Sequence, residues 1–90
     1  SIHQHLLILG TQNSIERVAA FLVGIADRRE GGGTKARLPM SRGDIADHLG
    51  LTLETVSRAI HRLQVLKLIT LVGAREVILL DRDALLDLGA

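Results

Sequence analysis

The side chains best suited to recognition chemistry lie between Thr52 and Arg58, where the sequence reads TLETVSR. Glu54 and Arg58 are four residues apart, so on a helix both would lie on one face. An arginine can donate two hydrogen bonds to O6 and N7 of guanine, and a glutamate can accept one from the exocyclic amine of a base. Ser57 can bond to a base or contact a thymine methyl group. The spacing therefore indicates reading of base edges in the major groove of DNA.

A simpler interpretation of Glu54 and Arg58 is an exposed ion pair within one helix. Such a pair would stabilise the helix by only about 0.3–0.5 kcal/mol and would recognise nothing. The choice between the two interpretations depends on the elements that carry the pair.

Two short helices joined by a tight turn are predicted around this segment. Ser41 is placed to cap a helix over 42–49, with Asp44 three residues later as in a capping box. Gly50 can adopt the left-handed conformation that ends a helix.

Thr52 can cap the second helix, over 53–66. Its apolar side is formed by Val56, Ala59, Ile60 and Leu63. Its outward side is formed by Glu54, Ser57, Arg58 and Arg62. This pattern is typical of a helix-turn-helix, which presents its second helix to DNA.

The N-terminal part is predicted to be helical. The spacing of apolar residues indicates a helix over 14–28, which Asn13 or Ser14 would cap. The apolar stretch within 1–10 could be the tail of a longer helix.

The segment 29–37 is predicted to be a flexible loop because it contains three consecutive glycines. A phosphate-binding loop would need a preceding strand and a Lys-Ser/Thr ending, and neither is present. Residues 38–40 are expected to form a short extended piece, since Pro39 disfavours a helical conformation in the residue before it.

The pattern changes after the second helix of the pair. Two short strands are predicted at 69–72 and 76–80, around a turn that contains Gly73. A final helix over 82–88 would be capped by Asp81 or Asp83, and three of its leucines would pack on the core: Leu85, Leu86 and Leu88. The expected fold is mainly α with a small β-hairpin, a winged helix-turn-helix.

Composition narrows the class of protein. Apolar residues make up 47% of the chain but aromatic ones only 1%, so the core must be aliphatic. The chain has no cysteine, which excludes a disulfide framework and a cysteine-ligated zinc or iron–sulfur site within it. No apolar run is long enough to cross a membrane and no signal peptide is recognisable. We expect a cytoplasmic protein.

The charge is distributed unevenly along the chain. Segment 35–67 has six basic and three acidic residues, a net charge of +3, whereas the rest has five basic and seven acidic residues, a net charge of −2. We therefore expect positive potential around the second helix of the pair, as a DNA-binding face requires.

The segment 38–64 resembles the C-terminal DNA-binding domain of the CRP/FNR superfamily of bacterial transcription regulators, and especially its FNR and FixK branch. The strongest likeness is TLETVSR, which carries the E-x-x-S-R pattern of that branch. MSRGDIA at 40–46 and LGL at 49–51 match in order and spacing. A weaker likeness extends over most of the chain. It implies that 1–10 is the end of a linker or dimerisation helix and that 11–90 is the winged-helix DNA-binding domain.

This resemblance implies that Glu54 and Arg58 read base edges and that Ser57 adds discrimination. It also implies that a homodimer binds an inverted repeat of TTGAT half-sites. The CRP branch has an arginine directly before the glutamate, where this chain has Leu53. That departure favours an FNR-like DNA site.

Contacts with the DNA backbone are also expected. Arg42 matches a phosphate-contacting position of the family, and a helix start offers free N–H groups to phosphate. Ser41 can share this role besides capping the helix. The other candidates for phosphate contact are Thr52, Thr55, Arg62 and Arg75. For Arg62 and Arg75, a purely solvated side chain is an equal alternative.

The resemblance places a sensor domain outside this segment, so the effector is unknown and no cofactor is expected within the segment. The expected partners are double-stranded DNA and a second copy of the chain, with RNA polymerase as a further candidate. The alternative function is a winged-helix module that binds a protein and does not read DNA. An enzyme is not expected, because no nucleophile or metal arrangement is recognisable.

Overall fold

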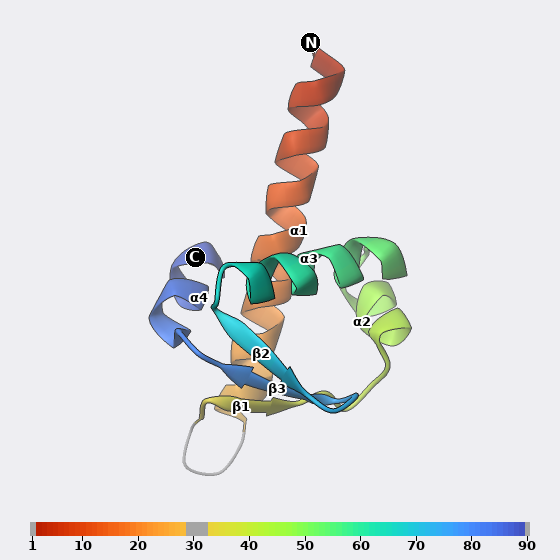
Figure 1. Cartoon of the computed structure of the whole chain (residues 1–90). Coiled ribbons are helices and arrows are strands. Elements are labelled where there is room, and N and C mark those ends of the chain that lie inside the picture. Colours follow the sequence, from red (N-terminus) through yellow and green to blue (C-terminus); the bar gives the residue numbers. More distant parts are fainter. Residues whose placement is uncertain (1, 29–32, 90) are drawn as a thin grey trace.

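The computed structural model describes residues 2–28 and 33–89, with side chains described at 13–28 and 33–88. Its elements in chain order are α1 (Ile2–Asp27), β1 (Lys35–Arg37), α2 (Arg42–Leu49), α3 (Leu53–Val65), β2 (Ile69–Val72), β3 (Glu76–Leu79) and α4 (Arg82–Gly89). Figure 1 shows the other elements arranged around the C-terminal half of α1, while its first half extends beyond them. This is the expected winged helix-turn-helix with one additional strand.

The core is aliphatic, as the composition predicts. Its buried side chains come from every element, and the largest fully buried ones are Leu22, Ile45, Ile60, Leu63, Ile69 and Leu85. Phe21 is half-buried and packs against this core. Burial of such side chains supplies most of the free energy that favours folding.

The turn between α2 and α3 has the geometry expected from the sequence. The Asp44 N–H donates to Oγ of Ser41 at 3.2 Å and so caps the start of α2. Gly50 ends the helix with φ of 71°, and the Leu51 N–H donates to the Ala46 carbonyl at 2.8 Å. These bonds satisfy backbone groups that a helix end leaves unpaired.

α3 is also closed at both ends. Its start is capped by Thr52, whose Oγ1 accepts a hydrogen bond from the Thr55 N–H at 3.1 Å. At its end the Leu68 N–H donates to the Leu63 carbonyl at 3.0 Å. Lys67 occupies the left-handed position between them with φ of 60°, a conformation usually taken by glycine.

The prediction for the start of the first helix was wrong. α1 begins at Ile2 and continues through Asn13 and Ser14, so neither residue caps it. Ser14 lies inside the helix and only 6% of it is exposed. The division of the chain near residue 10 falls within this continuous helix and stays a prediction.

The sheet has three strands where two were predicted. β3 is central and pairs antiparallel with β2 on one side and with β1 on the other. β1 lies within the segment that was predicted to be a loop, of which 29–32 are outside the described residues. The chain bends at Pro39 and Met40, where an extended piece was expected.

α4 begins as predicted and is capped by Asp81, whose Oδ1 accepts a hydrogen bond from the Ala84 N–H at 3.1 Å. Leu85 is fully buried and Leu88 packs on the core. Leu86 does not, because it lies on the outer side of α4 with 45% of its surface exposed.

Replacing Lys67 by glycine is expected to raise the free energy of unfolding by about 0.5–1 kcal/mol, because glycine adopts the left-handed conformation without steric cost. Urea denaturation followed by circular dichroism would measure the change. Lys67→Ala is the control, since it removes the charge but keeps the β-carbon. A gain with alanine as large as that with glycine would show that the charge, not the backbone, causes the effect.

Candidate nucleic-acid interface

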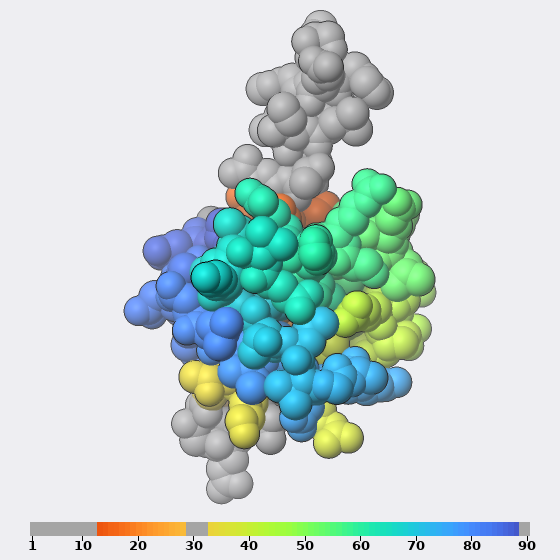
Figure 2. All heavy atoms as spheres, in the orientation of Figure 1, coloured from red at the N-terminus to blue at the C-terminus, as the bar shows by residue number. Residues whose placement is uncertain are grey.

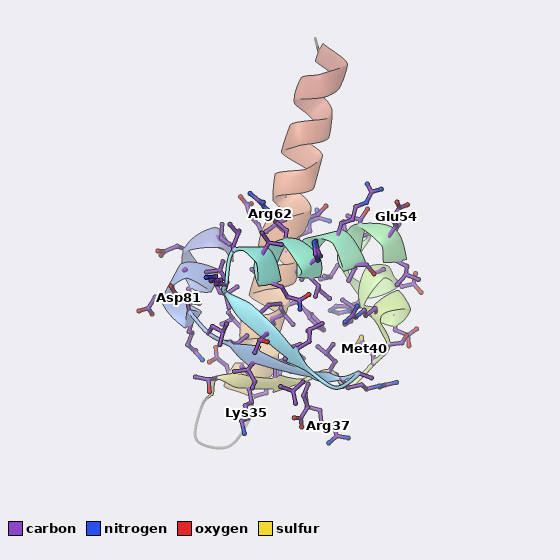
Figure 3. All side chains as sticks on the ribbon, viewed as in Figure 1. Lys35, Arg37, Met40, Glu54, Arg62 and Asp81 are labelled. Carbon is purple, nitrogen blue, oxygen red and sulfur yellow. The ribbon has the colours of Figure 1, made fainter. Side chains whose placement is uncertain are left out.

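The Glu54–Arg58 pair lies on the outer side of α3. Nη2 of Arg58 donates to Oε1 of Glu54 at 2.5 Å, while the side chain of Arg58 remains 78% exposed and that of Glu54 72% exposed. Figure 3 shows Glu54 projecting from the start of α3. A guanidinium has five N–H donors, so most of those of Arg58 remain available to a partner. The ion pair and the base-reading role are therefore compatible.

The other polar side chains near the start of α3 are less available to a partner, because they are more buried or already hydrogen-bonded. Ser57 and Thr55 are half-buried. The Thr52 hydroxyl donates to Oγ1 of Thr55 at 2.8 Å, in addition to capping the helix. The hydroxyl proton of Thr52 is therefore already used, whereas Thr55 can still donate its own to a phosphate.

The start of α2 offers a second set of contacts. Ser41 is exposed and Arg42 is half-buried. The first two N–H groups of α2, those of Arg42 and Gly43, have no carbonyl partner within the helix. Together with the positive end of the helix dipole, such groups favour a bound anion.

The wing is fixed close to this helix start. The N–H of Leu38, which lies three residues before Ser41, donates to the Arg75 carbonyl at 2.8 Å. Arg75 is exposed at the turn between β2 and β3. In Figure 2 the light-blue wing projects beside α2 and below α3. One side of the molecule thus carries the wing tip and the starts of two helices.

Arg62 lies one turn further along α3, beside α1 (Figure 3). Together with Thr55 and Arg58 it lines a hollow of about 380 Å³ between the two helices, to which α1 contributes Ser14 and Ile15. The basic side chains of α3 therefore extend along the helix toward α1.

Counting charges along the sequence gave too many basic side chains to the surface around α3. Lys35 and Arg37 project from β1 at the edge of the molecule opposite Glu54 and Arg62 in Figure 3. These two charges lie too far from the outer side of α3 to belong to the same surface. The basic residues expected near DNA are those of α2, α3 and the wing.

Two arginines, for which the sequence predicts no role, connect segments that are far apart in the chain. Nη1 of Arg17 donates to the Leu49 carbonyl at 2.9 Å and so connects α1 to the end of α2. Arg82 donates to the Gly33 carbonyl at 3.0 Å and forms an ion pair with Asp27. No sequence pattern identifies these partners, because they are 32 to 55 positions apart.

Within the part of the chain that the structure describes, no three histidine or acidic side chains come close enough together to hold a metal ion. No helix among the described residues has the length and apolar character needed to span a membrane.

A comparison with known families identifies residues 16–88 as a Crp-like helix-turn-helix domain. The nitrogen fixation regulation protein FixK of Rhizobium meliloti is 54% identical over 82 residues, which cover 91% of this chain and 38% of that protein. An anaerobic regulatory protein of Pasteurella multocida is 40% identical over 87 residues, covering 93% of this chain and 32% of that protein.

The fold is also similar to that of FixK2 from Bradyrhizobium japonicum, with a TM-score of 0.75 and 48% identity over 86% of this chain and 38% of that one. The chain thus spans less than two-fifths of the length of these relatives. Nothing in the comparisons supports a protein-binding module that does not read DNA. The chain belongs to the CRP/FNR superfamily of transcription regulators, as a Crp-like helix-turn-helix domain of the FixK-like branch that binds DNA.

Proposed function

We propose that the domain reads an inverted repeat of TTGAT half-sites, with Glu54, Ser57 and Arg58 in contact with base edges. The observation that carries this proposal is the exposed Glu54–Arg58 pair on the outer side of α3. An ion pair that only stabilised the helix would contribute little at such exposure. Its position in a helix-turn-helix frame gives both side chains a target in the major groove.

The hydrogen-bonding groups of each side chain suggest which base it contacts. Arg58 donates two hydrogen bonds to O6 and N7 of the guanine in the half-site, and Glu54 accepts one from an exocyclic amine of cytosine or adenine. The hydrogen bond between them orients the guanidinium before binding, so less conformational entropy is lost on contact. Ser57 is half-buried and reaches only a base that lies close to the helix.

We assign contacts with the DNA backbone to the residues around this pair. Arg42 and Ser41 contact one phosphate at the start of α2, and Thr52, Thr55, Arg62 and Arg75 contact others. Such contacts supply most of the affinity that does not depend on sequence. Thr55 contributes more than Thr52, because the Thr52 hydroxyl already donates within the chain.

The whole regulator acts as a cytoplasmic homodimer that places two α3 helices one helical turn apart in successive major grooves. It controls transcription through contact with RNA polymerase and has no enzymatic activity. No cofactor is assigned to this domain, and its effector is left unassigned. These proposals rest on the relatives, which by name are a nitrogen fixation regulation protein and an anaerobic regulatory protein.

The first test is fluorescence anisotropy with a duplex that contains TTGAT-N4-ATCAA and with a scrambled duplex, each at two salt concentrations. The chain should be measured alone and fused at its N-terminus to a dimeric coiled coil. We expect the dimer to prefer the repeat. Equal, salt-sensitive binding to both duplexes would contradict the assigned site, and no binding by the dimer would contradict DNA reading altogether.

Arg58→Ala is expected to weaken binding to the repeat by about 1–3 kcal/mol and to relax the preference for guanine at one position of each half-site. Titration of duplexes that carry each of the four base pairs at that position would measure both effects. An equal loss on all four duplexes would instead identify Arg58 as a phosphate contact.

Arg42→Ala is expected to weaken binding to all duplexes by a similar factor and to reduce the slope of log K against log salt by about one unit, because one phosphate contact is lost. Salt titrations on the repeat and on the scrambled duplex would show this. A loss confined to the repeat would contradict the assignment.

A further inference from the structure

The two helices of the helix-turn-helix differ in how closely they approach α1. α1 packs along α3 and α4. A hydrogen bond and a ring contact join α1 to α2, and both lie at the last turn of α2. Arg17 donates to the Leu49 carbonyl at 2.9 Å, and the Phe21 and His48 rings are 5.8 Å apart between centroids. Arg17 and Phe21 lie one turn apart on α1, so one face of this helix holds the end of α2.

The bond from Arg17 suits its acceptor. The last carbonyls of a helix lack partners within it and form the negative end of the helix dipole, which a cation stabilises. Arg17 also lies over the turn itself, because its Nη1 is 3.9 Å from the position that a β-carbon on Gly50 would occupy. A single side chain of α1 therefore contacts the end of α2 and the turn that leads to α3.

We propose that Arg17 is a positioning residue for DNA binding. It holds the last turn of α2, so that the phosphate-binding start of α2 and the base-reading face of α3 meet the same DNA at once. The proposal rests on the function proposed above. Arg17 itself contacts no base and no phosphate.

The geometry explains why this contact affects recognition. An α-helix of eight residues is about 12 Å long, so a small rotation about its last turn displaces Arg42 at the other end. Sequence-specific binding requires several short contacts to form together, whereas non-specific binding depends mainly on charge. Loss of the Arg17 contact should therefore reduce discrimination between sequences more than affinity for DNA in general.

The test compares Arg17→Gln with Arg28→Gln in the coiled-coil dimer. Arg28 is exposed on the turn that follows α1, and its side chain forms no hydrogen bond or ion pair with the described residues. Its variant therefore removes the same charge without removing such a bond. We expect Arg17→Gln to bind the TTGAT repeat roughly three- to tenfold more weakly than Arg28→Gln. Both variants should bind the scrambled duplex equally. Arg17→Lys, which can still donate to the Leu49 carbonyl, should recover most of the preference.

Circular dichroism and salt titrations separate this role from others. All variants should be folded at the temperature of the binding assay and should keep the salt slope of the Arg28→Gln control. Arg17→Gln with a lower Tm but an unchanged preference would show a purely structural role and overturn the proposal. A salt slope reduced by about one unit relative to that control would show a direct phosphate contact and overturn it too. A wild-type dimer without preference for the repeat would refute the proposed function together with this inference.

Discussion

The burial of one side of α3 is the constraint on which the rest of the structure depends. Val56, Ala59, Ile60 and Leu63 are almost completely buried, and they fix the rotation of the helix about its own axis. Glu54 and Arg58 are consequently held on the outer side. Because side chains on a helix keep a fixed angular relation, a core that positions four apolar residues also positions the polar ones. The same packing that stabilises the domain thus defines its recognition surface.

The helix-turn-helix could be predicted almost to the residue, because its signals are local. Ser41, Gly50 and Thr52 determine the helix ends through bonds within a few positions, and the apolar spacing of α3 defines its buried side. The family motif agreed with this independent reading. The roles of Glu54, Ser57 and Arg58 at individual bases remain predictions.

The remaining features depend on contacts that a sequence pattern does not contain. β1 has three residues, of which only Ala36 is buried, so its alternation is too short to be recognised in the sequence. Ser14 is a good capping residue, but the chain before it is already helical and its side chain is buried. Arg17 looks like an ordinary solvated residue until the fold brings it to Leu49. Likewise, a sum of charges over a segment ignores the fact that β1 and α3 face different sides of the molecule.

The third strand also affects the behaviour of the domain in crowded solution. A lone two-stranded wing would leave β3 with an open row of backbone N–H and C=O groups, to which another chain could add a strand. β1 pairs with the first three residues of β3, and the N–H of Leu79, the last residue of β3, donates to the Thr34 carbonyl at 2.6 Å. The outer edge of β1 is short and carries Lys35 and Arg37, and both brevity and charge discourage strand addition. β1 thus protects the wing against edge-to-edge aggregation while contributing a single side chain to the core.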